Sequence, residues 1–287
     1  MGLRIRAVGV EAGTGGTGVS RAASAVRRAL DLAGLSTVHT LVNVGVYRDA
    51  NLIEPAVAAL VQQESGLHLD YLDGRDGPPL MSFDLLNGAC GLLTAVHLAD
   101  ALTGTGEATL IVSGDGHPSG EPAVGFPYTA AAAAMVLDRA DGGFGPVAFR
   151  PVREEPGVRG YLDLAAAGDT GRATITVERD PALGTRLAEQ CAVLAAEHLA
   201  GNGLRPGEAD IVTMRPTPGF GAELAGRLGV SPARVHVPAA DTHTSALAVA
   251  FGEALTGGRF EPRERPVLFL AADAGVLTAC ALYRHDR

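Results

Sequence analysis

One cysteine of the chain occupies a position at which a thiol could act as a nucleophile. In FDLLNGACGLLTAVHLADAL, residues 83–102, Cys90 lies where a strand-like run gives way to a helix-like one. The first turn of a helix presents unpaired backbone N–H groups and the positive end of the helix dipole, and both favour a thiolate. The small residues Gly88, Ala89 and Gly91 would let a bulky thioester approach the sulfur. Cys90 is therefore a candidate nucleophile, and a buried structural cysteine at a helix start is the alternative.

The segments that would position Cys90 alternate between strand and helix patterns. The spacing of apolar residues in 1–143 predicts the order β-α-β-α-β-α-β-β. The strands are expected at 3–10, 38–47, 81–86, 108–113 and 131–137, and the helices at 19–35, 54–65 and 90–102. A polar, glycine-rich break at 138–143 ends this series.

A similar series follows the break. Strands are expected at 147–152, 173–177, 211–214, 234–238, 267–272 and 277–283, and helices at 183–199, 222–228 and 245–255. We therefore expect an α/β protein made of two copies of one unit, with residues 1–143 as the half that carries Cys90 and residues 144–287 as the second half.

Composition and charge exclude several classes of function. The 287 residues carry a formal net charge of −9 without a Lys/Arg cluster, which disfavours nucleic acid as a partner. The three cysteines are odd in number and widely spaced, which indicates neither a disulfide framework nor a metal site, and Cys191 and Cys280 are expected in the core. No signal-peptide h-region and no run near the ~18 apolar residues of a membrane span is found. We expect a cytoplasmic protein without a membrane partner.

Around Cys90 the sequence resembles the active-site turn of ketoacyl synthase III and its relatives in the thiolase superfamily. The duplicated unit is similar to that superfamily's architecture, ADTHTSALAVAFGEAL at 240–255 resembles its GNTSAA helix start, and LAADAGVLTACALYR at 270–284 resembles its closing hairpin. The resemblance implies a five-layered α-β-α-β-α fold and acyl loading on Cys90. It also implies an oxyanion hole made by the N–H groups of Cys90 and Gly275.

Two supporting positions differ from the family's His/Asn pair. Arg215, in MRPTPGF, stands about where the histidine is expected, and a slip of one residue would bring Met214 or Pro216 there. Arg215 would bind a carboxylate or phosphate, or fill the vacated space. His243 stands in the asparagine position, two residues after Asp241, which is a candidate for substrate binding. We expect His243 to be a neutral general base, with a role only in starting its helix as the alternative.

Three further features bear on substrates and partners. VYRDANLIEPAVAALV, residues 46–61, resembles the head-to-head acyl-CoA condensing branch, in which Glu54 would be a base reaching across a dimer interface; a local helix-start carboxylate is the alternative. His117, in VSGDGHPSG, is a weaker candidate for substrate binding in a loop that would lie near that interface, and a solvated turn residue is the alternative. The first strand runs through EAGTGGTG directly into the helix, so the part of the family that brackets the CoA adenine is missing.

The predicted function is an acyltransferase or condensing enzyme. It would load an acyl group from a CoA or carrier-protein thioester onto Cys90 and pass it to a second substrate, in specialised metabolism and without ordinary malonyl decarboxylation. The thioester is a substrate, and no cofactor is expected. The expected assembly is a homodimer or a heterodimer with another thiolase-fold subunit. A non-catalytic partner subunit of a condensing enzyme and a thioester hydrolase are the alternatives.

Overall fold

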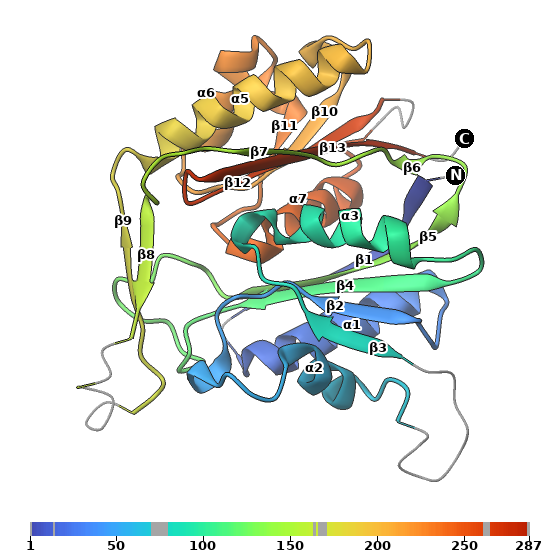
Figure 1. Ribbon diagram of the computed structural model, residues 1–287, viewed down its shortest axis with the longest axis vertical. Coiled ribbons are helices and arrows are strands. Elements are labelled where there is room, and N and C mark those ends of the chain that lie inside the picture. Colours follow the sequence, from blue (N-terminus) through green and yellow to red (C-terminus); the bar gives the residue numbers. More distant parts are fainter. Residues whose placement is uncertain are drawn as a thin grey trace.

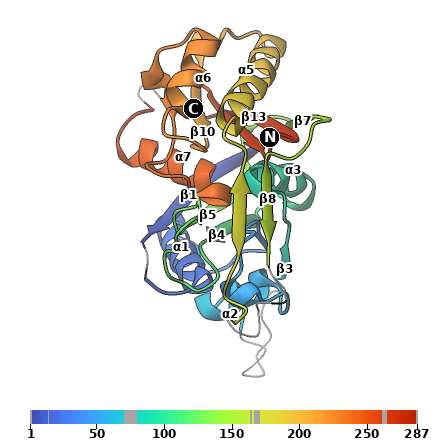
Figure 2. The same cartoon turned by 90° about the vertical axis from the view of Figure 1, so that its left-hand side faces the viewer.

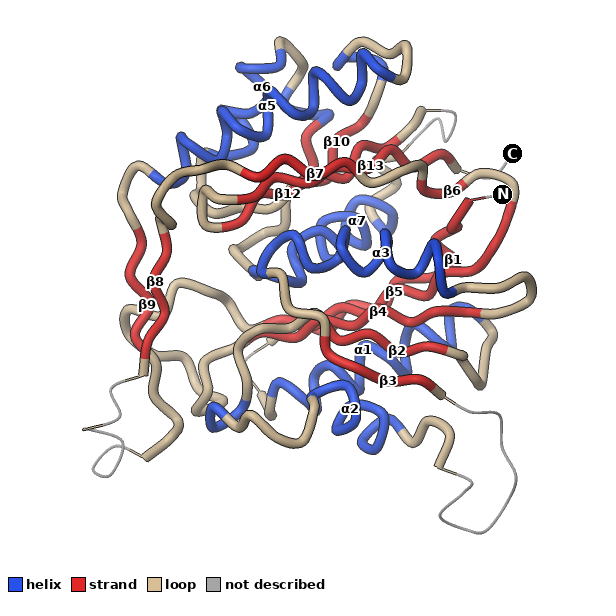
Figure 3. Tube along the Cα trace, in the orientation of Figure 1, coloured by secondary structure: helices blue, strands red, loops and turns tan. Residues whose placement is uncertain are grey.

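The computed structural model describes residues 2–13, 15–69, 80–162, 165, 171–260 and 265–285. The chain forms five layers in which helices and sheet alternate (Figure 1). The outer helical layers are α5 (Leu183–Gly201) with α6 (Phe220–Leu228), and α1 (Gly18–Ala33) with α2 (Val57–Ser65). The central layer is α3 (Gly91–Leu102) with α7 (Ala246–Thr256), which Figure 3 shows between two groups of strands. The α-β-α-β-α fold predicted from the sequence is confirmed.

The strands of the first half form one side of the sheet. Their order is β1-β5-β4-β2-β3. The elements are β1 (Gly2–Ala12), β2 (Thr40–Asn43), β3 (Met81–Asp84), β4 (Ala108–Asp115) and β5 (Ala131–Ala140).

Small residues let α1 lie close to this part of the sheet. A Cβ at Gly9 would lie 2.2 Å from the carbonyl oxygen of Ala25, so only glycine admits the helix at this distance. The alanine run that begins β5 is buried along its whole length, as expected of a strand covered on both faces.

The strands of the second half form the other layer, in the order β11-β10-β12-β13. They are β10 (Asp210–Thr213), β11 (Val235–His236), β12 (Val267–Asp273) and β13 (Leu277–Arg284), and β7 (Ala148–Pro151) pairs with β13. The short β6 (Gly143–Phe144) pairs with both β13 and β1 and so joins the two layers into one sheet.

Two predicted elements differ from the structure. The strand expected at 173–177 is β9 (Thr176–Arg179), which pairs with β8 (Val158–Tyr161) in a separate two-stranded ribbon rather than joining the main sheet (Figure 2). The helix expected at 54–65 begins at Val57, because the Asp84 carboxylate of β3 accepts the N–H groups of Val57 and Ala58 at 3.0 and 2.8 Å. Residue patterns do not reveal such contacts between distant segments.

The two central helices begin side by side, each preceded by a short 3-10 turn. Gly88–Cys90 precedes α3 and His243–Ser245 precedes α7, and the two turns are in contact. The ends of β4 and β12 also meet these turns. The fold therefore brings Cys90 and His243 together, although they are far apart in the sequence. Within the part of the chain that the structure describes, no helix is both long and apolar enough to cross a membrane.

Candidate active site

Cys90 is the residue directly before α3, at its N-cap position, and its side chain is fully buried. The thiol contacts the carbonyl oxygen of Leu277, which accepts at 3.8 Å. Burial, and next the negative charge of Asp273, raise the pKa of the Cys90 thiol far above its usual range. This differs from the thiolate expected at a helix start, because removal from water outweighs the helix dipole.

Asp115 and His243 form a buried pair beside this turn. His243 Nδ1 lies 2.6 Å from Oδ2 of Asp115, the last residue of β4. The Asp115 carboxylate also accepts the hydroxyl of Thr244 at 2.7 Å and the backbone N–H groups of Val46 and Tyr47 at 2.8 Å each. Asp115 therefore fixes the His243 ring, and Nε2 of that ring lies 3.9 Å from Oδ1 of Asp273.

The charges around His243 favour its protonated form. Burial alone would lower the pKa of His243, but the carboxylates of Asp115, Asp273 and Asp241 raise it above its usual value. Burial likewise opposes ionisation of Asp115, yet His243 and the hydrogen bonds to Asp115 lower the pKa of that carboxyl. The three carboxylates thus favour the protonated ring over the neutral one expected from the helix start, and a protonated His243 can donate a proton or stabilise negative charge.

Asp273, the last residue of β12, is a second carboxylate of the site. Like Asp115, it was not predicted from the sequence. Its Oδ1 accepts the backbone N–H of Ala89 at 3.2 Å, so it lies next to the Cys90 turn. Gly88 has a φ of +49°, and a Cβ there would lie 2.4 Å from the carboxylate atoms of Asp273. Glycine at position 88 therefore allows the left-handed turn and leaves room for the Asp273 carboxylate.

A small cavity opens beside the two turns. Its apolar wall is formed by Val158, Leu183, Leu187 and Met214. Its polar wall is formed by Tyr128, Arg179, Asp241, His243 and Asp273. Ala89 also lines the cavity, whereas the neighbouring Cys90 lies behind the wall.

Tyr128 packs against His243, and Arg179 lies over the Tyr128 ring. The Tyr128 ring lies 4.3 Å from the His243 ring, centroid to centroid, and the Arg179 guanidinium carbon lies 4.5 Å from the Tyr128 centroid. Asp241 binds Arg179 at 2.6 Å and accepts the backbone N–H of His243 at 3.1 Å. The predicted residue Asp241 therefore belongs to the site and holds both Arg179 and the His243 turn.

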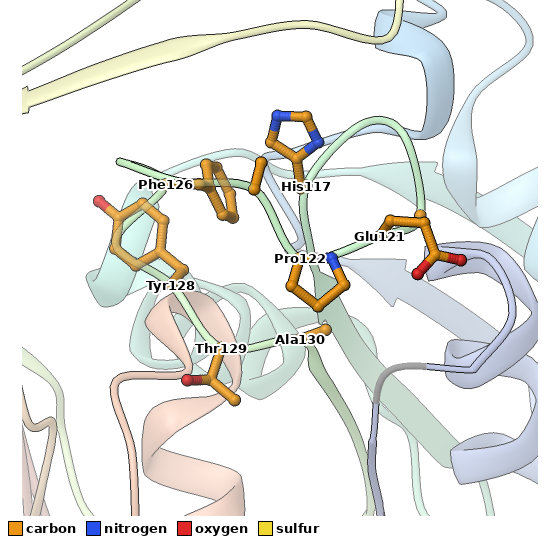
Figure 4. Close-up of a pocket in the computed structure, with 9 residues that line it drawn as sticks. His117, Glu121, Pro122, Phe126, Tyr128, Thr129 and Ala130 are labelled. Carbon is orange, nitrogen blue, oxygen red and sulfur yellow. The ribbon is translucent and has the colours of Figure 1, made fainter.

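His117 lines a second pocket, on the other side of Tyr128. Figure 4 shows it with Phe126, Tyr128 and Thr129, all on the segment between β4 and β5. The His117 ring packs edge-on against Phe126 at 5.2 Å, and burial lowers the pKa of His117. Tyr128 is common to both pockets, and His117 follows the end of β4 by two residues, so His117 lies near the Cys90 site without lining its cavity.

The other predicted site residues lie outside the cavity. Glu54 is exposed on the segment before α2. Arg215 donates to the carbonyl oxygens of Pro238 and Ala239, and Met214 and Pro216, the two alternatives to it, line the cavity instead. The Gly275 carbonyl accepts the Gln190 amide at 3.1 Å, and this turn reaches the cavity through residues 272–274.

The positions of Asp115 and Asp273 in the sequence give a weak indication of their place in the site. Asp115 follows a buried strand and Asp273 stands two residues before Gly275, both places where a side chain can turn into a site. Among the residues the structure describes, no group of three His, Cys, Asp or Glu side chains is arranged to hold a metal ion.

Comparisons by sequence and by structure give different results. No protein-family profile and no curated protein matches the sequence. The structure, in contrast, superposes on 3-oxoacyl-(acyl carrier protein) synthase III from Pseudomonas aeruginosa with a TM-score of 0.83 at 15% identity, covering 100% of this chain and 99% of that one. The enzyme of the same name from Aquifex aeolicus matches with a TM-score of 0.73 at 17% identity, covering 99% and 100%.

A variant of OleA from Xanthomonas campestris also matches, with a TM-score of 0.76 at 17% identity and 99% of both chains covered. A priming β-ketosynthase of a polyketide biosynthetic pathway matches with a TM-score of 0.77 at 18% identity, covering 99% of this chain and 97% of that one. The chain therefore has the thiolase-like fold of ketoacyl synthase III over its whole described length.

Proposed function

We propose that this protein is an acyl-transferring enzyme of the ketoacyl synthase III type, in which Cys90 accepts an acyl group from a CoA or carrier-protein thioester. The observation that carries the proposal is the contact between the Cys90 turn and the His243 turn, with Asp115 behind His243. The structural neighbours include a 3-oxoacyl-(acyl carrier protein) synthase III and a polyketide priming β-ketosynthase, which supports this class of reaction.

The loading step exchanges one thioester for another. The Cys90 sulfur attacks the thioester carbonyl carbon, the bond from that carbon to the donor sulfur breaks, and the proton of the Cys90 thiol ends on the departing donor thiol. The His243 imidazolium would stabilise the developing oxyanion or protonate the leaving sulfur. Because Cys90 is buried, the cavity wall at Ala89 and Asp273 must open for the donor to reach the sulfur.

The charges of the site disfavour malonyl decarboxylation. The family's His/Asn pair polarises a thioester carbonyl so that carbanion charge can develop, whereas the corresponding wall here carries Met214 and His243. The Asp273 carboxylate, which has no arginine partner in the described part of the chain, would repel both the malonyl carboxylate and the carbanion. We therefore propose transfer to a second small substrate without decarboxylation, a reaction suited to specialised metabolism.

We further propose that the protein is a homodimer that associates through β3. Among the residues that the structure describes, this strand is at the edge of the sheet, with no strand paired on its outer side. Large apolar side chains are exposed around it: Met81 is 47% exposed, Leu86 49% and Ile53 79%. Glu54, which follows Ile53, would then lie at the interface, where its predicted role across the dimer could be tested.

One observation favours a second candidate, the non-catalytic partner subunit. Cys90 is fully buried and its thiol pKa is raised, as expected of a cysteine that only packs. Such a subunit would use the same dimer surface to bind an active condensing enzyme.

Thiol release from acyl donors tests the two candidates. A panel of acyl-CoA and acyl-carrier thioesters is mixed with the protein, and the free thiol is measured with time. Covalent catalysis predicts an initial burst that approaches one thiol per protein chain, lost in Cys90→Ala and kept in the matched control Cys191→Ala. A release that is absent with every donor, or equal in Cys90→Ala, would support the non-catalytic partner instead.

A further inference from the structure

Asp273 is the one cavity carboxylate that faces the space beside Cys90 with a substantial part of its side chain open. The Asp273 side chain is 30% exposed, against 13% for Asp241 and 0% for Asp115. The Asp273 carboxylate is held in place by the Ala89 N–H and by the close approach of Gly88. The carboxylate is therefore held at the cavity surface next to the proposed nucleophile.

The other carboxylates of the site already have partners that neutralise them. Asp115 contacts the His243 ring, and Asp241 forms an ion pair with Arg179. Within the described part of the chain, the only basic side chain within 4.0 Å of Asp273 is His243, at 3.9 Å, and that ring already faces Asp115 through its other nitrogen. Asp273 thus lacks a charge partner of its own within hydrogen-bonding distance.

The remaining wall would suit the apolar body of a small ligand. Leu183, Leu187 and Met214 form one side of the cavity, and Tyr128 closes another. Of the two carboxylates that line the cavity, Asp273 is the one without an arginine partner among the described residues, so a cation gains more from the open part of this wall than an anion does. The cavity has a volume of about 30 Å³. Once its wall opens, as it must for the acyl donor, a ligand with a short alkyl body and a cationic head would match both the apolar wall and the open carboxylate.

We infer that the acyl acceptor is a primary amine whose ammonium group binds Asp273 beside the acylated Cys90. This inference rests on the proposed acyl loading of Cys90 and names the class of its second substrate. Asp273 is then the residue that selects an amine over an alcohol, a carboxylate or water.

The transfer step balances with Asp273 as the proton carrier. The ammonium gives one proton to the Asp273 carboxylate, and the free amine attacks the thioester carbonyl carbon. A carbon–nitrogen bond forms, the carbon–sulfur bond to Cys90 breaks, and the sulfur takes the second amine proton. The products are an amide, the Cys90 thiol and one proton, which leaves Asp273 for solvent.

Binding of a simple amine tests the inference without requiring acylation. Isothermal titration calorimetry at neutral pH with n-butylammonium as the probe compares the wild type with Asp273→Asn, which keeps an acceptor for the Ala89 N–H. The matched control is Asp100→Asn, which removes the same charge at the far, exposed end of α3. We expect the affinity to fall at least tenfold in Asp273→Asn only, and n-butanol to show no such difference.

Discharge of the S-acyl protein tests the chemistry. We expect n-butylamine to remove the acyl group at least ten times faster than n-butanol or water, and this preference to disappear in Asp273→Asn. Equal amine affinity in Asp273→Asn and the wild type, or equal discharge by butanol or water, would overturn the inference. If the protein binds the amine through Asp273 but never forms an acyl adduct, the proposed function fails while the amine site stands.

Discussion

Asp115 determines how His243 is oriented and charged. In the folded protein the pKa of His243 is raised, so the stability this gives is complete below the usual histidine pKa and is lost as pH rises through the folded value. The pKa of Asp115 is lowered, so its contribution is present above the usual carboxyl pKa and is lost as pH falls through the folded value. The Asp115–His243 pair therefore stabilises the fold mainly at pH values between the folded-state pKa of Asp115 and that of His243.

Replacing Asp115 with Asn should destabilise the protein most within that window. Breaking one side of a buried pair costs about 3 kcal/mol or more, while Asp100→Asn, which breaks a surface pair, should cost about 0–1 kcal/mol. The measurement is the free energy of unfolding in urea over a series of pH values. The assignment fails if the difference between wild type and Asp115→Asn does not shrink as pH rises above the histidine range.

The environment of Cys90 predicts a slow thiol. Because burial and Asp273 raise its pKa, alkylation of Cys90 by iodoacetamide near neutral pH should be about 100-fold slower than that of a free cysteine. Removing the Asp273 charge lowers the pKa, so Asp273→Asn should react faster at Cys90. Peptide mass spectrometry after timed alkylation measures both rates, and equal rates in the two proteins would show that Asp273 does not control the thiol.

Several individual residues of the site could be predicted, and others could not. Cys90, His243 and Asp241 were found because a family resemblance fixes their place along the chain. Asp115 and Asp273 were missed because their roles depend on where two strand ends meet the two central turns, which only the fold determines. Nothing in the sequence indicated that several carboxylates surround His243 and raise its pKa, because Asp115 and Asp273 come from distant segments.

The turn before α3 is the element on which the site most depends. Gly88→Ala forces a left-handed alanine and places a Cβ against Asp273, so it should cost more than the ~1–2 kcal/mol of the backbone conformation alone. Gly34→Ala, at a left-handed helix end with open space around it, is the matched control for that backbone cost.

Urea unfolding of these two variants, with Cys90 alkylation as a second readout, measures the effect. We expect only Gly88→Ala to change the reactivity of Cys90, because only there is Asp273 displaced. Equal destabilisation by the two substitutions, with unchanged alkylation, would mean that the turn does not hold Asp273 in place.

Element order was largely predictable, because the periodicity of apolar residues is local. The first half follows the expected β-α-β-α-β-α-β-β order, and α5 and α7 lie within a few residues of their predicted ranges. The β8–β9 ribbon and the late start of α2 were not predictable, since they depend on the strand each segment pairs with and on the Asp84 cap.

At the scale of the whole molecule, the exposed edge at β3 predicts association. Sedimentation should give a particle of twice the 29.3 kDa chain mass, and Met81→Asp should shift it to the monomer by placing a charge on the apolar edge. Val193→Asp, on the exposed side of α5, is the matched control and should leave the dimer intact. A wild-type monomer, or an unchanged dimer in Met81→Asp, would place the interface elsewhere or remove it.

The central claim is that Cys90 carries the acyl group, and intact mass after incubation with acyl-CoA and acyl-carrier thioesters tests it most directly. The chain contains no lysine, so side-chain amines cannot compete for the acyl group, and a thioester is recognised by its removal with hydroxylamine. We predict one hydroxylamine-labile acyl adduct per wild-type chain and none in Cys90→Ala. An adduct of equal extent in Cys90→Ala, or no adduct with any donor, would contradict the account.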